Sequence, residues 1–274
     1  MSNCKKISII TPSFNQGEFI EDTIKSVISQ NYEKFEYIII DGGSNDDTVD
    51  IIKRYQDKIS YWISEPDYGQ TNAINKGLKI ATGDIITYLN SDDLFLPGTL
   101  EKIANYFNIY QDRYFVYGNT IVIDKKGEVI KYRKQLKFNK NIACMIGFGL
   151  VIDQPATFWR KEVFEKIGFF NENLYYTMDA DYWFRISRYY KLYYINEYLA
   201  KFRWHSQSKT IISKNSNKKL KYELTSHRIL TYNTLPISKY ISFKYAKPLY
   251  LIYRFKRILL RFFKLHYFIK KSYL

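Results

Sequence analysis

Short apolar runs alternate with longer amphipathic stretches over the first part of the chain. Runs rich in β-branched residues predict strands, and apolar residues at helical spacing between them predict helices. The predicted strands cover residues 7–10, 37–40, 59–64 and 85–89, and the predicted helices cover residues 18–30, 47–57, 71–81 and 97–110. Strands that alternate with helices at short spacing favour a mainly parallel sheet with helices on both faces. We therefore expect an α/β fold.

The pattern becomes less regular after residue 113. Short apolar runs predict strands at 115–117 and 120–123, on either side of a Gly118-Asn119 turn, and a further strand at 129–132. Helical spacing of apolar residues predicts helices at 162–167 and 179–189.

Charge is distributed unevenly. Residues 201–274 contain 18 Lys and Arg residues and one acidic residue, whereas residues 1–200 contain 24 Lys and Arg residues and 26 acidic residues. The net charge of +15 therefore belongs to the last quarter of the chain. A basic segment on a near-neutral body favours contact with a surface, and we expect no nucleic-acid partner.

Residues 251–269 fit a basic amphipathic helix. Basic residues fall on one face of the helical projection and apolar residues on the opposite face. Such a helix suits an anionic membrane surface. The alternative is that its apolar face packs on the body of the protein or on a second subunit. We expect the membrane contact.

Cysteine usage and hydropathy bear on the compartment. Cys4 and Cys144 are too few for a disulfide framework and lack the spacing of a metal site. A strand-like run begins at Lys6, so we expect no signal peptide, and no stretch approaches the roughly 20 apolar residues that span a bilayer. We expect a cytoplasmic protein that is peripheral at the inner face of the cell membrane.

Three polar clusters follow predicted strands directly, at residues 11–15, 41–47 and 90–93. In open α/β sheets, ligands bind beyond the carboxyl ends of the strands, so these clusters should line one cleft. The adjacent carboxylates of Asp92 and Asp93 repel each other unless a cation offsets them, which favours Mg²⁺ or Mn²⁺; a solvated turn is the alternative. The 41–47 loop either accepts bonds from a nucleobase or ribose, or is an ordinary turn with a helix cap.

A series of short motifs lies between residues 5 and 210. They are IITPSFN at 9–15, IDGGS at 40–44, EPDYGQ at 65–70, AINKG at 73–77, ATGD at 81–84, LNSDD at 89–93 with Pro97-Gly98, QPATF at 154–158, MDADYWFR at 178–185 and FRWH at 202–205. This series resembles family 2 glycosyltransferases.

The resemblance implies a GT-A fold with a catalytic domain at 1–210. Residues 1–112 would form its nucleotide-sugar half and residues 113–210 its acceptor half, followed by a basic, amphipathic extension at 211–274. It also implies inverting transfer of a sugar from a nucleotide-diphosphate donor, with UDP as the favoured nucleotide. The acceptor would be a hydroxyl of a lipid-linked glycan in bacterial surface-polysaccharide biosynthesis.

The resemblance further assigns residues on the donor side. Thr11 and Pro12 would line the base pocket and Asp41 would hold the base. Lys76 would either face the diphosphate or cap a helix. The remaining donor-side candidates are Asn15, Asp67, Asn90 and Ser91.

Asn90-Ser91-Asp92 occupies the place of the family's Asp-x-Asp motif. Asp92 would be the ligand of Mn²⁺ or Mg²⁺, with Asp93 close by and His205 as a metal ligand or phosphate contact. The family often has Asp where Asn90 stands, which weakens any claim of a second carboxylate there.

Asp179 lies where the family places its catalytic base, and Asp181 is the second choice. An acceptor hydroxyl must lose a proton as it attacks the anomeric carbon, and a positioned carboxylate can take that proton. By pattern alone, both residues could equally be acidic residues that favour a helix start.

Two other classes of function compete with this interpretation. A sugar-nucleotide nucleotidyltransferase needs a glycine-rich basic phosphate loop after the first strand, but residues 11–15 contain no Lys or Arg. A non-catalytic protein that binds membrane or nucleic acid through its basic tail would tolerate loss of Asp92 and Asp179. We expect an enzyme.

Overall fold

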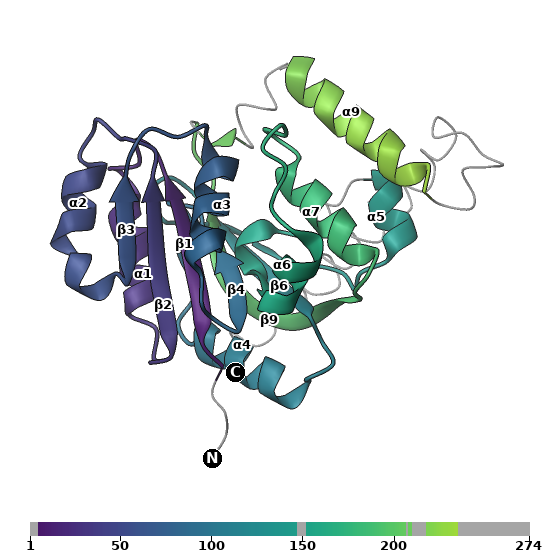
Figure 1. Cartoon of the computed structure of the whole chain (residues 1–274), viewed down its shortest axis with the longest axis horizontal. Coiled ribbons are helices and arrows are strands. Elements are labelled where there is room, and N and C mark those ends of the chain that lie inside the picture. The colour runs from purple at the N-terminus through teal and green to yellow at the C-terminus, as the bar shows by residue number, and fades with distance from the viewer. Residues whose placement is uncertain (1–4, 147–151, 207, 210–217, 235–274) are drawn as a thin grey trace, which may run out of the picture.

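One mixed sheet organises the molecule. The computed structural model describes residues 5–146, 152–206, 208–209 and 218–234. Figure 1 shows the sheet with helices on its two faces. Its strands are β1 (Ile7–Ser13), β2 (Phe35–Asp41), β3 (Tyr61–Ser64), β4 (Ile85–Tyr88), β5 (Leu94–Phe95), β6 (Phe115–Ile123), β7 (Val129–Arg133), β8 (Thr157–Arg160) and β9 (Leu192–Arg203).

The helices occupy the segments between these strands. They are α1 (Ile20–Ile28), α2 (Thr48–Arg54), α3 (Gln70–Ile80), α4 (Thr99–Ile109), α5 (Lys140–Ile146), α6 (Lys161–Ile167), α7 (Met178–Ser187) and α9 (Lys218–Tyr232), with short 3₁₀ turns at Gln56–Lys58 and Gln154–Ala156. The predicted α/β fold is therefore confirmed.

The strand order is β3-β2-β1-β4-β8-β6-β9-β5, and β7 pairs with β6 outside this path. The first four strands are parallel to one another, as the sequence pattern predicts. β8 runs antiparallel to both β4 and β6, and β9 is parallel to β6, so the complete sheet is mixed.

The turn predicted at Gly118-Asn119 is wrong, because β6 continues through both residues. A Cβ atom on Gly118 would lie 2.6 Å from the side chain of Leu199 and 2.8 Å from the backbone oxygen of Glu197. Glycine therefore serves here to let β9 lie close to β6. The Asn119 side chain is buried and accepts a hydrogen bond from the backbone N–H of Gln135.

Helices cover both faces of the sheet. On β1, Ile7 and Ile9 belong to the core shared with α1, α2 and α4, whereas Ile10 belongs to the core shared with α3, α6 and α7. A strand buried on both faces needs apolar residues at consecutive positions, which explains the continuous runs in the sequence.

Part of the basic extension contacts the body. Of residues 211–274, the structure describes 218–234, where α9 lies beside α5 and α7 (Figure 1). The buried carboxylate of Glu223 accepts hydrogen bonds from the backbone N–H groups of Tyr175 and Tyr176, just before α7. The predicted amphipathic helix at 251–269 lies outside the described residues. Among the described helices, none has the length and apolar character needed to cross a bilayer.

Candidate active site

The loop after β4 joins two distant parts of the chain. β4 ends at Tyr88, and the short strand β5 that follows the loop pairs antiparallel with β9. This pairing places the loop beside the end of β9. As a result, Asp92 Oδ2 lies 2.9 Å from Nε2 of His205. The structure thus brings together two of the predicted metal ligands.

Arg203 at the end of β9 holds this arrangement in place. Its side chain is 2% exposed, and its Nε donates to the backbone oxygen of Asp92 at 2.9 Å. A second guanidinium nitrogen pairs with Asp22 on α1 at 3.0 Å. A buried guanidinium needs several acceptors, and these contacts fix the backbone that carries Asp92.

Asp93 has a different environment from Asp92. Its carboxylate is fully buried and accepts the backbone N–H of Arg203 at 2.9 Å. Burial raises the pKa of Asp93 well above its ordinary value, and the charge of Asp92 adds to this effect. Among the described residues, no group of three His, Cys, Asp or Glu side chains is arranged to hold a metal ion.

The Asp92–His205 pair has the chemistry of a partial cation site. A carboxylate oxygen is a ligand that Mn²⁺ and Mg²⁺ prefer, and an imidazole nitrogen is a ligand of divalent transition metals, so the pair suits Mn²⁺ better than Mg²⁺. The Asp92 side chain is 17% exposed, so oxygen ligands from a substrate can reach it. His205 packs on Phe19, with ring centroids 4.4 Å apart, which fixes the imidazole. These residues fit a cation that takes its other ligands from a phosphate and water.

Asn90 is held by a pair of glutamines. Gln70 Nε2 donates to Asn90 Oδ1 at 2.6 Å, and Asn90 Nδ2 donates to Gln154 Oε1 at 3.1 Å. Gln154 Nε2 in turn donates to the backbone oxygen of Tyr88 at 2.6 Å, so its amide oxygen must face Asn90. A carboxylate at position 90 could not donate to that oxygen, which explains Asn at this position.

Asp179, the predicted base, is connected to the last residue of β4, directly before the same loop. It lies in the first turn of α7, is partly exposed, and accepts a hydrogen bond on Oδ1 from the hydroxyl of Tyr88. Desolvation by the surrounding protein raises the pKa of Asp179 to about 6, although Tyr88 and Lys209 act in the opposite direction. Burial also raises the pKa of Tyr88, so this hydroxyl remains a proton donor.

Asp181, the second choice for the base, has a partner on its own helix. Its carboxylate pairs with Nε of Arg185 at 2.8 Å. The same guanidinium donates to the backbone oxygens of Ile167 and Phe169, which anchors the α6–α7 connection. Asp181 is therefore ion-paired with a cation on its own helix, whereas Asp179 accepts a bond from the neutral hydroxyl of Tyr88.

Asp41 orders the loop that follows β2. Its buried carboxylate accepts bonds from the backbone N–H groups of Gly43 and Ser44 and from the hydroxyls of Ser44 and Ser64, at 2.6 to 3.2 Å. Asn15, which has a φ of 51°, accepts the backbone N–H of Asn45 at 3.0 Å and so joins this loop to the end of β1.

The other donor-side candidates have local partners. Buried Thr11 accepts a bond from Tyr37 at 3.2 Å, and Asp67 accepts the backbone N–H of Gly69 at 2.6 Å. Lys76 pairs with Glu65 at 2.6 Å, so its ammonium has a carboxylate partner. Pro12 and Ser91 are buried. In the part of the chain that the structure describes, no hydrogen bond connects Asp41 or these residues to Asp92.

Sequence reasoning missed three side chains of this network. Tyr88 holds Asp179, Gln70 holds Asn90, and Lys209 donates to Gln70 Oε1 at 2.8 Å. Burial lowers the pKa of Lys209 to about 8, although the charges of Asp179 and Glu223 oppose this effect. The only sequence signal was the position of Gln70 within a recognised motif; Tyr88 and Lys209 carried none.

The fold is shared with solved glycosyltransferase structures. S. aureus TarS 1-349 in complex with UDP-GlcNAc superposes with a TM-score of 0.65 at 17% identity, covering 84% of this chain and 67% of that one. The mannosyltransferase PcManGT from Pyrobaculum calidifontis, in complex with GDP-Man and Mn²⁺, gives a TM-score of 0.60 at 15% identity, covering 82% and 63%. These similarities confirm the predicted GT-A fold.

Sequence relatives agree with the structural ones. An uncharacterized glycosyltransferase of Rickettsia felis is 33% identical over 77% of this chain, which spans 36% of the length of that relative. One from Methanocaldococcus jannaschii is 29% identical over 72% of this chain and 70% of its own length. The family model for glycosyl transferase family 2 matches residues 8–168, more than half of the sequence. The chain belongs to glycosyl transferase family 2.

Proposed function

We propose that this protein transfers a sugar from a nucleotide-diphosphate donor to a hydroxyl of an acceptor, with inversion at the anomeric carbon. The observation that supports this most directly lies on one short segment. Tyr88 holds the carboxylate of Asp179, and four residues later Asp92 faces His205 at 2.9 Å. Asp179, the proposed base, and the Asp92–His205 pair, the proposed cation ligands, are thus both connected to the end of β4.

Asp179 is the proposed general base. Its pKa of about 6 leaves it mostly ionised at pH 7 while keeping it basic enough to accept a proton. The Tyr88 hydroxyl occupies Oδ1, so Oδ2 is the oxygen that receives the acceptor proton. Direct attack by one hydroxyl inverts the anomeric centre and needs no covalent enzyme intermediate.

Asp92 and His205 are the residues that would hold Mn²⁺ or Mg²⁺. A bound divalent cation supplies positive charge next to the departing diphosphate. The structural neighbour with GDP-Man and Mn²⁺ supports this assignment. Asp93 is proposed to support the loop from within, since its carboxylate faces the backbone of Arg203.

UDP remains the proposed nucleotide, with the base held near Thr11, Pro12 and Asp41. The structural neighbour in complex with UDP-GlcNAc supports UDP, and the neighbour in complex with GDP-Man makes GDP the main alternative nucleotide. The proposed acceptor is a lipid-linked glycan in polysaccharide biosynthesis. It rests on the basic amphipathic pattern at 251–269, which would hold the enzyme at the cytoplasmic face of a membrane.

The reaction class is tested by incubating the protein with a panel of nucleotide-sugars and Mn²⁺. Release of a nucleoside diphosphate, lost in Asp92→Ala and retained in the surface control Asp57→Ala, is the expected result. Release of pyrophosphate would instead identify a nucleotidyltransferase. Absence of turnover with every donor would contradict the enzymatic proposal.

Membrane contact is tested separately on the full-length chain. Replacing Arg254, Arg257, Arg261 and Lys264 together by Gln should release the protein from anionic lipid vesicles. Unchanged vesicle binding would contradict the proposed membrane contact and would leave the proposed sugar transfer unaffected.

A further inference from the structure

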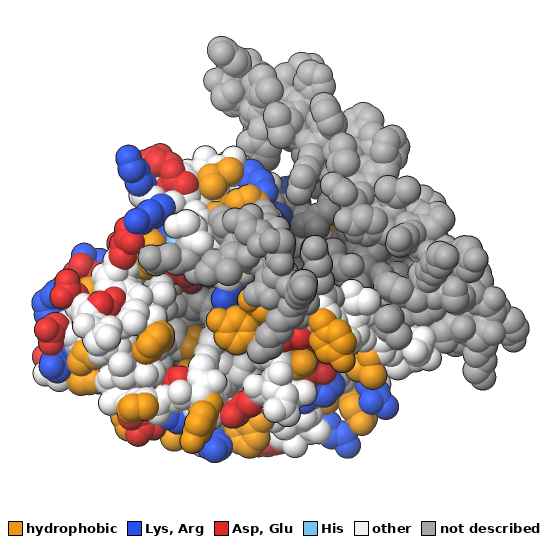
Figure 2. Space-filling model, turned by 90° about the horizontal axis from the view of Figure 1, so that it is seen from above, with side chains coloured by type: hydrophobic (Ala, Val, Ile, Leu, Met, Phe, Trp, Pro, Cys, Tyr) orange, Lys and Arg blue, Asp and Glu red, His pale blue; other side chains and the backbone are white. Residues whose placement is uncertain are grey.

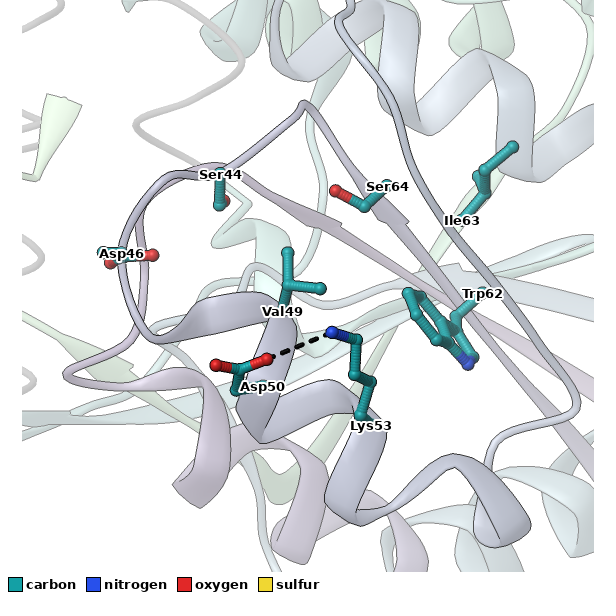
Figure 3. Close-up of a pocket in the computed structure, with 8 residues that line it drawn as sticks. All are labelled: Ser44, Asp46, Val49, Asp50, Lys53, Trp62, Ile63 and Ser64. Atoms are coloured by element: carbon teal, nitrogen blue, oxygen red, sulfur yellow. Dashed lines mark hydrogen bonds and ion pairs between the residues drawn. The ribbon is translucent and has the colours of Figure 1, made fainter.

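A pocket lies outside the network around Asp92. It has a volume of about 640 Å³ and lies between α2, the loop after β2, and β3, which is an edge strand of the sheet. Figure 3 shows Val49 and Lys53 of α2 on one side and Trp62 of β3 on the other. Ser44 and Asp46 of the lining belong to the 41–47 loop, but none of the lining residues is among the individually named donor, metal or base candidates of the proposed reaction.

The pocket combines one aromatic ring with charged side chains that remain exposed to solvent. Trp62 is partly exposed, and its inner side packs against the core beneath α1 and α2. An indole anchored in this way offers a fixed apolar surface to a ligand. Lys53 and Asp50 form an exposed ion pair at 3.1 Å at the pocket rim, with side chains 55% and 77% exposed.

Charge argues against an anionic ligand here. Asp46 and Asp50 contribute two carboxylates, and the ammonium of Lys53 already pairs with one of them. Acidic and basic side chains are interspersed over the side of the molecule where α2 lies (Figures 1 and 2). A phosphate or uronate would meet net negative charge, whereas a neutral molecule would not.

Hydrogen-bonding capacity argues against a purely apolar ligand. The free oxygen of Asp50 accepts, the ammonium of Lys53 has donors beyond its bond to Asp50, and the hydroxyl of Ser64, which donates to Asp41, still has lone pairs to accept. An aromatic face beside alternating donors and acceptors matches a ring with an apolar C–H face and hydroxyls at its edge. The volume lies within the range of small-ligand sites.

We infer that the pocket between α2 and β3 binds one neutral sugar unit of a glycan, with Trp62 beneath the ring and Asp50 and Lys53 bonded to its hydroxyls. This inference rests on the proposed function, since an enzyme that extends a glycan would meet such a ligand. The pocket adjoins the Asp41 loop because Ser44 and Ser64 line it and donate to Asp41. A glycan held here would be retained on the predicted nucleotide-sugar half of the protein, next to the Asp41 loop.

The test is isothermal titration of the full-length protein, without donor or cation, with neutral hexasaccharides of glucose, N-acetylglucosamine and mannose and with an anionic hyaluronan hexasaccharide. At least one neutral hexasaccharide should bind, and Trp62→Ala should weaken that binding by at least about tenfold. Tyr61→Ala, a 44% exposed aromatic outside the pocket lining, should retain it.

A second variant guards against a folding defect in Trp62→Ala. The double replacement Asp50→Ala with Lys53→Ala removes only exposed groups and should weaken binding by about fivefold or more, while Lys58→Ala should not. Failure of every neutral hexasaccharide to bind, binding of the anionic one alone, or binding unchanged in both pocket variants would overturn the inference.

Donor turnover is measured on the same samples. Both pocket variants should hydrolyse nucleotide-sugars at the wild-type rate, and Asp92→Ala should keep hexasaccharide binding. Absence of donor turnover together with normal hexasaccharide binding would contradict the proposed reaction and leave the pocket assignment standing.

Discussion

Replacing Tyr88 by Phe isolates the role of one hydroxyl in the proposed chemistry. The ring of Tyr88 is fully buried and packs edge-on against Trp159 and Phe170, so Phe keeps the packing. The change removes the hydrogen bond to Asp179 Oδ1. It should therefore alter the titration of Asp179 more than the fold.

The size of the effect follows from the bond that is lost. A hydrogen bond to a charged group contributes about 1.5–3 kcal/mol, and one pKa unit corresponds to about 1.4 kcal/mol. The pKa of Asp179 should rise from about 6 to about 7–8. At pH 7 the ionised fraction would then fall by about two- to tenfold, with activity falling in proportion.

The assay is nucleoside diphosphate release, as kcat/KM, between pH 5.5 and 9.5. Because the base must be ionised, activity is lost as pH falls through the pKa of Asp179, so the acid limb should move upward in Tyr88→Phe and the two enzymes should converge above pH 9. Tyr182→Phe is the matched control, since the hydroxyl of this buried residue of α7 has no hydrogen-bond partner among the residues that the structure describes. An acid limb that stays near pH 6 in Tyr88→Phe would refute the reasoning.

Three further predictions concern the frame around the site. Gly77→Ala should lower the free energy of unfolding by about 1–3 kcal/mol in urea titrations, because its Cβ would lie 2.4 Å from Ile10. Burial opposes ionisation of Glu36, yet hydrogen bonds lower its pKa from 4.5 to about 2, so Glu36→Gln should cost about 3 kcal/mol at pH 7. This difference in the free energy of unfolding should shrink as pH falls from 4.5 towards 2, which thermal unfolding across this range would show. Arg203→Lys should lower the free energy of unfolding by about 2 kcal/mol or more, because a lysine ammonium cannot bind the backbone oxygen of Asp92 and the carboxylate of Asp22 in the way that the planar guanidinium does. It should also weaken the Mn²⁺-dependent protection of the protein against unfolding by the donor.

The parallel half of the fold was predictable because its strands are buried on both faces. Continuous β-branched runs such as residues 37–40 have few alternatives in a chain with helices between them. The turn at Gly118-Asn119 was mispredicted because Gly-Asn favours a turn locally. The glycine is needed for another reason, since β9 packs too close to Gly118 to leave room for a side chain.

Adjacent positions in the sequence do not guarantee a shared environment in the site. Asp92 and Asp93 are adjacent in the chain, yet one faces His205 and the other faces the buried backbone of Arg203. The two residues lie at the end of a turn that the backbone N–H of Asp93 closes by donating to the backbone oxygen of Asn90 at 3.1 Å, and this turn sends the two side chains in different directions. Sequence adjacency therefore suggested a shared metal site that the described contacts do not form.

The positions of Tyr88 and Lys209 depend on tertiary contacts. Tyr88 meets Asp179 across 91 residues, and Lys209 meets Gln70 across 139 residues. Nothing in the local pattern of either residue distinguishes it from an ordinary core tyrosine or surface lysine. Their roles appear only once the strand order places α7 and the segment after β9 beside the end of β4.

The role of Asp179 as the base is the central claim, and Asp179→Asn tests it most directly. The replacement keeps the shape of the side chain, so donor protection against thermal unfolding in Mn²⁺ should match the wild type. Sugar transfer to acceptor should fall by about 10²- to 10⁴-fold at pH 8. Transfer within a few-fold of the wild type, with donor binding unchanged, would contradict the account.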